Sequence, residues 1–507
     1  MSDVVIDGTS LTVRDVVRVA REKAQVVLSP EALLRVRRAR DLVERLVRDR
    51  KVVYGVTTGF GKFAEVTISA EQAEELQMNL LKSHAVGVGD PLPEEVTRAV
   101  MLLRANALAK GYSGVREEVV LRLLDLLNSG VHPVIPAKGS LGASGDLAPL
   151  AHLALVLVGR GEAVCDGELV TGAEALRRRG LRPLQLAAKE GLALINGTQV
   201  MTAITALAYH DAEVLARCSD CVAALTGEAL RVIPEAYHRL LHEVRPHPGA
   251  QAVASNLRQL LQGSRLVAKA GDQKVQDAYA LRCIPQVHGA VRDALKHVGE
   301  ILQRELNAAT DNPLVFPDEG VILSGGNFHG EPVALAADYL GMATAELGSI
   351  SERRIERLVN PHLSRLPAFL TDRGGLNSGF MIAQYTAAAL ASENKVLASP
   401  AVVDSIPASA NQEDHVSMGA VAARKAREIV WNVTRILAIE WMCAAQAVEF
   451  LDPSALGRGT RAIYQLLRQH IPPLESDREL APEVEKTASL LGSSLLAAVE
   501  SALGPLA

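Results

Sequence analysis

Residues 413–449 read EDHVSMGAVAARKAREIVWNVTRILAIEWMCAAQAVE and form one of five long segments rich in Ala, Leu and Val. The apolar residues recur at helical spacing and cover much of the circumference, which predicts a long helix buried on most sides. Four similar stretches lie at about 184–227, 287–309, 332–358 and 376–398. Such weakly polar helices must pack against each other, so we expect a mainly α protein built on an elongated bundle of long central helices.

The helical pattern divides the chain into three predicted regions. A mixed N-terminal region covers 1–183, the long helices occupy 184–450, and a C-terminal helical region covers 451–507. The long helices are apolar on nearly all sides, whereas a bundle that stands alone normally has a clear polar face. We therefore expect other subunits to cover the remaining apolar surface, so that the protein is an oligomer.

Short elements are expected in and around the N-terminal region. β-prone residues predict strands near 4–6 and 11–13, and a Ser-Pro pair is typical of the start of an amphipathic helix at about 29–50. Two hairpins are predicted at Glu162–Val170 and Leu314–Leu323, because each contains a turn sequence ending in glycine between β-prone residues.

Composition and charge argue against several classes of protein. Hydrophobic residues make up 48% of the chain and charged residues 22%, which is typical of a soluble globular protein. The 53 basic and 58 acidic side chains are interspersed and give a formal charge of -5, so no basic surface for nucleic acid is expected. The most apolar run, Leu147–Val158, is too short to span a membrane, and the scattered cysteines fit reduced thiols. We expect a cytoplasmic protein that binds neither nucleic acid nor a membrane.

The stretch Gly139-Ser-Leu-Gly-Ala-Ser-Gly-Asp-Leu-Ala-Pro149 is the most informative about chemistry. It places small residues just before an expected helix start at Asp146. If the amide nitrogen of Gly145 approaches the carbonyl carbon of Ala143, a five-membered ring can close. Loss of two waters, one of them from Ser144, then leaves an exocyclic alkene, which is an electrophile. Glycine alone reaches so tight a geometry at low steric cost. Composition by itself favours a plain glycine-rich, capped turn, so the other motifs decide between the two.

This segment resembles the Ala-Ser-Gly motif of the aromatic amino acid ammonia-lyases and aminomutases, and the resemblance covers most of the chain. It implies a mainly α fold like that of fumarase and aspartase and a homotetramer with shared active sites. It also implies the cofactor 4-methylideneimidazole-5-one, formed autocatalytically from Ala143-Ser144-Gly145. The other motifs of the family occur in the order that the family uses, at Tyr54–Gly61, Ile195–Thr198, Val275–Arg282, Gly325–Gly330 and Asn411–Met418.

Two positions resemble the members of this family that act on histidine. Ser83-His84 is similar to their substrate-selecting pair, and an imidazole at His84 can hydrogen-bond a substrate imidazole. Leaving that group unpaired beside an apolar ring would cost on the order of 1–3 kcal/mol. Glu413 stands where phenylalanine-acting relatives usually carry an amide. The resemblance thus implies elimination of ammonia from L-histidine to give trans-urocanate.

The sequence leaves two other hypotheses of function open. The first is a tyrosine or phenylalanine ammonia-lyase, or an aminomutase, that uses the same cofactor. The second is a helical scaffold that has lost catalysis, which would predict damage to Ser144, Tyr54 or Arg282. All three residues are present.

The resemblance also implies catalytic roles. The substrate amine adds to the methylidene carbon derived from Ser144, and Tyr54 takes the β-proton, for which its phenol must be shifted towards phenolate. Tyr279 and Glu413 are the other catalytic residues expected. Arg282 binds the substrate carboxylate, since its planar fork of donors matches that group.

The remaining substrate contacts are expected from residues that line the pocket. Gln276, Tyr279 and Arg282 are spaced by three residues, which predicts that they share one helix face. Asn196 and Gln276 would complete the polar lining, and Phe328 would pack beside the cofactor.

No metal site is expected from the sequence. His238 and His242 have a spacing that metal ligands use, but no persuasive third ligand lies nearby and the elimination needs no metal. Cys218-Ser-Asp-Cys221 has the spacing of half a zinc site but lacks a second pair.

Overall fold

The computed structural model describes residues 2–49, 51–53, 58, 72–272 and 274–507. Helices dominate these residues, and the strands form only two- and three-stranded sheets, so the predicted mainly α class is confirmed. By compactness the chain divides into unit 1, which comprises Met1–His210, Gly299–Asp338 and Pro400–Arg424, and unit 2, which comprises Asp211–Val298, Tyr339–Ser399 and Lys425–Ala507. The units group residues by spatial contact, whereas the three regions predicted along the chain stay a prediction.

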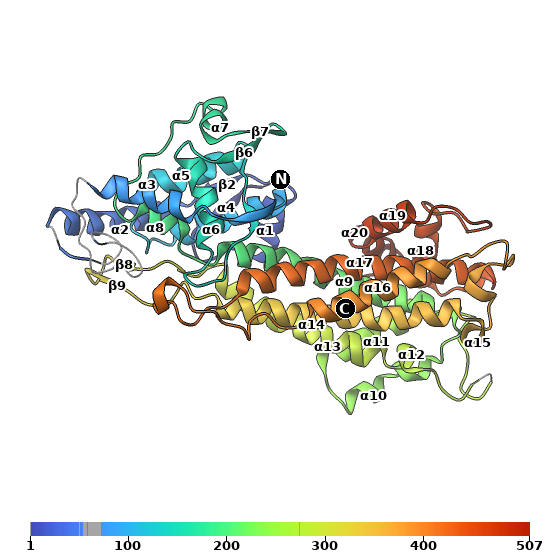
Figure 1. Cartoon of the computed structure of the whole chain (residues 1–507). Coiled ribbons are helices and arrows are strands. Elements are labelled where there is room, and N and C mark those ends of the chain that lie inside the picture. The colour runs from blue at the N-terminus through green and yellow to red at the C-terminus, as the bar shows by residue number, and fades with distance from the viewer. Residues whose placement is uncertain (1, 50, 54–57, 59–71, 273) are drawn as a thin grey trace. The chain divides into compact units, whose positions relative to one another are not determined.

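Unit 1 is organised around helix α4, in which every residue from Val96 to Ala109 is buried. Helices α1, α2 and α5 pack against α4, while α3 and α8 pack against α6 (Figure 1). This second group matters for function because α6 follows the Ala-Ser-Gly segment directly. The helices confined to unit 1 are α1 Val13–Ala20, α2 Pro30–Arg48, α3 Ala73–His84, α4 Glu94–Ala109, α5 Glu117–Asn128, α6 Leu147–Leu157, α7 Gly172–Arg178 and α8 Glu190–Ile195.

The small sheets of unit 1 confirm both predicted hairpins. Strands β6 and β7 pair antiparallel across the first turn, and β8 and β9 across the second. Strand β1 is also confirmed, and it pairs with β2 in parallel. The strands are β1 Val4–Ile6, β2 Val26–Leu28, β3 Val88–Pro91, β4 Val131–Pro133, β5 Pro136–Lys138, β6 Glu162–Cys165, β7 Glu168–Thr171, β8 Leu314–Phe316 and β9 Val321–Leu323.

Capping decides where the first helices start. Ser29 caps α2, its side chain accepting from the backbone N–H of Ala32, as the Ser-Pro pair predicts. The strand expected at 11–13 is wrong. Thr12 and Asp15 instead form a capping box that starts α1 at Val13, because each side chain accepts a backbone N–H of the other residue.

All five predicted long helices are present, and three begin later than the apolar pattern suggests, among them the fourth, which starts at Met381 rather than at 376. The first predicted segment is interrupted at Asn196-Gly197, so that α8 ends and α9 starts at Gln199. The last begins at Gly419 rather than 413, because the residues before it form a loop in which Met418 has a left-handed backbone, φ +53°. The long helices are α9 Gln199–Ala229, α13 Ile284–Glu305, α14 Glu331–Val359, α16 Met381–Leu397 and α17 Gly419–Glu449.

Unit 2 has one continuous apolar core, to which α9, α14, α16 and α17 contribute together with shorter helices (Figure 1). A buried ion pair lies in the same unit, where the Arg354 guanidinium donates to both Glu440 oxygens at 2.6 and 2.9 Å. Within the described residues, none of the helices combines the length and apolarity needed to cross a bilayer. The remaining helices of unit 2 are α10 Arg239–Glu243, α11 Pro248–Leu260, α12 Tyr279–Arg282, α15 Pro361–Ser364, α18 Arg458–Arg468, α19 Ala481–Leu490 and α20 Ser493–Leu503.

Candidate active site

The Ala143-Ser144-Gly145 segment folds back on itself in the loop between β5 and α6. Gly142 and Ala143 each form an isolated backbone bridge with Gly145. Gly142 and Gly145 both have positive φ, +75° and +73°, which side-chain-bearing residues rarely adopt. A Cβ on Gly145 would overlap the carbonyl of Gly197, and one on Gly142 would overlap the Ser417 hydroxyl. The segment is therefore compact and depends on glycine at both positions, as a ring closure between Ala143 and Gly145 would require.

Asp146 holds this loop in place through hydrogen bonds. Its backbone N–H donates to the Gly197 carbonyl at 2.7 Å, and Ser140 Oγ donates to Oδ1 at 2.9 Å. Oδ2 accepts the N–H groups of Val200 and Met201, at 3.0 and 2.8 Å, in the first turn of α9. A carboxylate at that helix end interacts favourably with the α9 dipole.

The position of Asp146 confirms one expectation and corrects another. Helix α6 does start next to it, but its side chain makes no capping hydrogen bond to α6. The alternative in which Asp146 simply caps the turn is therefore wrong, because its carboxylate accepts hydrogen bonds from the first turn of α9 instead. Complete burial raises the pKa of Asp146 to about 6, although its hydrogen bonds act in the opposite direction.

Glu413 lies beside Ser144, whose hydroxyl donates to Glu413 Oε1 at 3.5 Å. Glu413 belongs to the loop before α17, and its backbone pairs with Ala408 through hydrogen bonds of 2.9 and 3.2 Å. Burial raises the pKa of the Glu413 carboxyl above its usual value, while the hydrogen bond from Ser144 lowers it. The same loop also contacts Ala143, which packs against Val416 and Met418. A carboxyl group that can hold or release a proton thus lies next to Ser144.

Asn196 approaches the segment from the end of α8. It precedes Gly197, whose backbone forms a bridge with Gly145. Its Nδ2 donates to the Asn312 carbonyl at 3.0 Å, and its own carbonyl accepts from Arg104 at 2.8 Å. The side-chain oxygen of Asn196 is buried and has no hydrogen-bond partner among the described residues. Such an oxygen is an acceptor ready for a ligand N–H.

His84 is the last residue of α3. Its Nδ1 lies 2.8 Å from the Leu80 carbonyl, an acceptor, and therefore carries the proton. Burial lowers the pKa of His84, although the hydrogen bond to Leu80 raises it. The neutral ring thus presents an Nε2 lone pair that can accept a hydrogen bond.

The residues predicted to bind the substrate carboxylate belong to unit 2. The prediction that Gln276, Tyr279 and Arg282 share one helix face is wrong. Helix α12 spans only Tyr279–Arg282, and Gln276 lies before it. The physical reason is Asp277, whose buried carboxylate accepts from the N–H of Ile233 at 2.7 Å and holds this stretch outside a helix. The Arg282 guanidinium lies over the Tyr279 ring, 4.6 Å from its centroid, and Tyr279 is 69% exposed.

Two further predicted site residues are Phe328 and Tyr54. Phe328 is half-buried in unit 1, in the loop before α14. Tyr54 lies outside the described residues. The structure thus brings together Ala143, Ser144, Gly145 and Glu413, with Asn196 one residue from the bridge to Gly145, all in unit 1.

Sequence reasoning missed several supports of the segment, namely Ser140, Arg104, Ser417 and the anchoring role of Asp146. Ser417 Oγ donates to the Gly142 carbonyl at 3.5 Å, and Arg104 is buried and also donates to Gln199 at 2.8 Å. Asp146 was detectable, because an acidic residue directly after the Ala-Ser-Gly motif needs a partner. Ser140, Arg104 and Ser417 act through individual hydrogen bonds that leave no sequence pattern.

The two metal motifs noted in the sequence have structural explanations. His238 is the residue before α10 and accepts the Leu240 N–H at 3.3 Å, whereas His242 is buried against the Ala236 carbonyl. Cys218 and Cys221 are buried in α9, where burial raises the pKa of Cys218 to about 12 and holds that of Cys221 well above its ordinary value. Thiols with such pKa values are poor nucleophiles and poor metal ligands.

Comparisons with known proteins give a consistent result. A sequence model of the aromatic amino acid lyase family matches residues 11–469. The histidine ammonia-lyase of Symbiobacterium thermophilum is 61% identical over 98% of this chain and 99% of its own length. The crystal structure of histidine ammonia-lyase from Trypanosoma cruzi is similar with a TM-score of 0.92 and 46% identity, covering 99% of this chain and 96% of that one.

The fold is also shared with relatives of other specificity. The tyrosine aminomutase of Streptomyces globisporus is similar with a TM-score of 0.95 and 40% identity, covering 99% of both chains. The chain belongs to the aromatic amino acid lyase family. Because the backbone is common to lyases and aminomutases, the choice of substrate depends on individual side chains.

Proposed function

We propose that this chain is a histidine ammonia-lyase, which eliminates ammonia from L-histidine without oxidation and gives trans-urocanate. Four relatives bearing the name histidine ammonia-lyase are 57–61% identical to it over nearly their full lengths. The observation that carries the proposal is the folded-back segment at 143–145 with the Glu413 carboxyl at Ser144.

The residues at 143–145 fit the cofactor 4-methylideneimidazole-5-one. Gly145 has the positive φ and the lack of space for a Cβ that a tight backbone approach requires. Hydrogen bonds of Asp146 to Ser140 and to the start of α9 hold the loop in place. When formed, the cofactor supplies an electrophilic carbon that makes the substrate amine a better leaving group.

Two acceptors in unit 1 match the N–H groups of a substrate imidazole. His84 offers the Nε2 lone pair, because Nδ1 is engaged with Leu80. Glu413 offers a carboxylate that can hold an imidazolium, and the raised pKa of this group makes it a stronger acceptor for the imidazolium proton. A phenyl ring could donate a hydrogen bond to neither group, so both would be left unpaired at a cost on the order of 1–3 kcal/mol.

The other roles follow the chemistry of the side chains. Tyr54 removes the β-proton, and the buried oxygen of Asn196 accepts from the substrate amino group. Arg282 binds the carboxylate, and its contact with the Tyr279 ring fixes the plane of the guanidinium. Gln276 and Phe328 complete the lining.

The proposed working unit is a homotetramer in which more than one chain contributes to each site. Its support is exposed apolar surface on long helices, which a subunit interface would cover. The residues are Leu335, Tyr339 and Met342 on α14, Ile382, Tyr385 and Val396 on α16, and Trp431 on α17.

The test of this function is a comparison of substrates. L-Histidine, L-tyrosine and L-phenylalanine are supplied separately, and the ultraviolet absorbance of the conjugated acid is followed. We expect urocanate to form fastest. Faster formation of coumarate or cinnamate would instead support a tyrosine or phenylalanine ammonia-lyase. The structural similarity to tyrosine aminomutase is the reason for testing that alternative. An aminomutase would also yield a β-amino acid, which chromatography of the products separates.

A further inference from the structure

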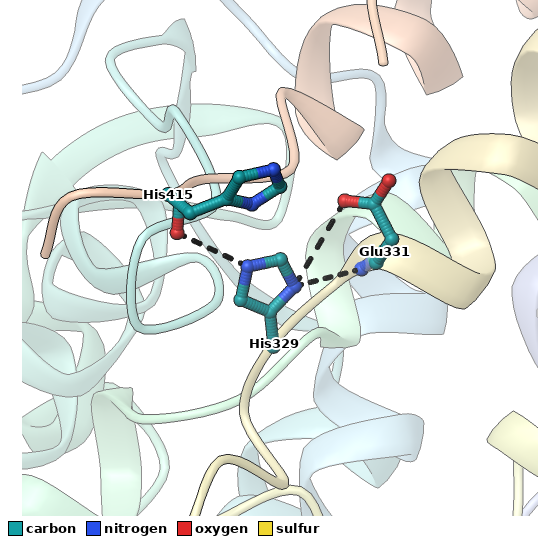
Figure 2. A group of neighbouring side chains, drawn as sticks. All are labelled: His329, Glu331 and His415. Carbon is teal, nitrogen blue, oxygen red and sulfur yellow. Dashed lines mark hydrogen bonds and ion pairs between the residues drawn. The ribbon is translucent and has the colours of Figure 1, made fainter. Parts of the chain in front are cut away.

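Three side chains in unit 1 that the proposed reaction does not use gather at the start of α14. They are His329, Glu331 and His415, and one potential ligand atom from each lies within 4.8 Å of the other two (Figure 2). His329 and Glu331 flank the helix start, while His415 comes from the loop that precedes α17. Two imidazoles and a carboxylate are a donor set that binds zinc and similar divalent ions.

His329 is already oriented as a metal ligand. Its Nε2 lies 3.1 Å from the backbone carbonyl of His415, which can only accept, so Nε2 carries the proton. Nδ1 therefore has the lone pair, and it faces Glu331 Oε2 at 4.0 Å (Figure 2). Metal-bound histidines characteristically donate their other N–H to a carbonyl or carboxylate, which fixes the tautomer and the ring.

The competing explanation is that His329 only caps α14. Its Nδ1 does accept the backbone N–H of Glu331, but at 3.3 Å, beyond the usual 2.9–3.0 Å for such a bond. Capping also leaves the carboxylate unexplained. Glu331 Oε2 is closed off from solvent and has no hydrogen-bond partner among the described residues. A buried, unpaired carboxylate oxygen is costly, and a cation beside it would offset that cost.

We propose that His329, Glu331 and His415 bind one divalent transition-metal ion, for which Zn²⁺ is the best match. His329 Nδ1, a Glu331 carboxylate oxygen and a His415 ring nitrogen supply three bonds, and water supplies the fourth. Zinc bonds of about 2.0–2.2 Å require ligand atoms closer together than they lie without the ion. Small rotations of Glu331 and of His415, whose side chain is exposed, bring them there.

The site has a consequence for the loop that carries Glu413. His415 lies two residues after Glu413, so a bound ion joins that loop to the first turn of α14. The ion stabilises the folded loop because the metal binds the folded arrangement and not the unfolded one. It takes no part in the elimination, and its binding is measured without substrate, so failure of the proposed reaction would not affect the test.

Binding is tested by calorimetric titration of the full-length, chelator-treated protein with ZnCl₂. We expect one ion per chain. Glu331→Gln and His415→Ala, tested separately, each weaken the affinity about tenfold or more, because each removes one of three ligands. His238→Ala is the matched control, since it removes a histidine of the rival His238–His242 pair and leaves the three ligands intact. No binding, unchanged affinity in both ligand variants, or an equal loss in the control would overturn the proposal.

A spectroscopic measurement covers the case in which a ligand variant fails to fold. Co²⁺ replaces Zn²⁺ in His and carboxylate sites and absorbs visible light strongly when four-coordinate. We expect wild-type protein to show this absorption, to lose it on addition of Zn²⁺, and to show a shifted spectrum in Glu331→Asp. A spectrum like that of cobalt in water would contradict the site, whatever the stability of the variants.

Discussion

The cofactor segment at 142–146 in unit 1 and the recognition segment at 275–282 in unit 2 serve the same proposed reaction but are built in opposite ways. The first is buried and held by backbone bridges, by two glycines of positive φ and by Asp146. The second contains only a four-residue helix, α12, whose first residue, Tyr279, is exposed. The proposed reactive group is thus fixed by its own chain, while the residues proposed to bind the carboxylate are exposed or half-buried.

Removal of the proposed reactive group should lower histidine turnover more than a change to its support or to the proposed substrate-recognition residues. Ser144→Ala deletes the precursor of the alkene with almost no change in volume, so turnover of histidine falls by on the order of 10³-fold or more while folding is retained. Steady-state kinetics and thermal unfolding of the purified variant measure the two. Near-wild-type turnover would exclude the self-made electrophile. Thr202→Ala, a change of similar size in the neighbouring α9, is a suitable control.

The support beneath the segment predicts a pH dependence of stability. The folded-state pKa of Asp146 is raised to about 6, above its ordinary value of 3.8, so the folded protein keeps a proton that the unfolded chain releases. Its contribution to stability is therefore fully present below pH 4 and declines as the pH rises towards 6, by roughly 3 kcal/mol in all.

Asp146→Asn removes this titration. We expect the melting temperature of wild type, measured relative to that of Asp146→Asn, to fall between pH 4 and pH 6 and then to level off. A constant difference between the two proteins across that range would show that the carboxyl does not retain a proton on folding. Asp125→Asn, which alters an exposed carboxylate in α5, should leave the pH profile of wild type unchanged.

The smallest expected effect concerns choice of substrate. Replacing Glu413 by Gln and His84 by Leu removes both acceptors for the imidazole, so histidine turnover weakens and the preference for histidine over phenylalanine falls about tenfold or more. Ratios of kcat/KM for the two amino acids measure the shift. If histidine stayed preferred by the original margin, neither residue would recognise the imidazole.

Much of the fold could be predicted because local rules determine it. Ser29 caps α2, and turn residues ending in glycine place both hairpins. The failures occur where distant contacts override the local pattern. The apolar run at 413–449 continues through Met418, yet the pairing of Glu413 with Ala408 keeps the first residues out of the helix.

The candidate site shows the same division. The Ala-Ser-Gly motif identified Ser144 because its residues are adjacent in sequence. The spacing of Gln276, Tyr279 and Arg282 misled because Asp277 has a partner, Ile233, far away along the chain. The carboxylate of Asp146 had to be seen in space before its role in α9 was apparent.

We propose that the cofactor segment of one chain works with the recognition segment of another. Ser144→Ala and Arg282→Ala, each inactive alone, are dissociated reversibly, mixed in equal amounts and allowed to form mixed tetramers. If the two segments of each site come from different chains, random mixing leaves about a quarter of the sites with both residues intact, so histidine turnover returns to roughly a quarter of wild type. No recovery, with mixed tetramers demonstrated, would mean that each chain supplies both residues to its own site.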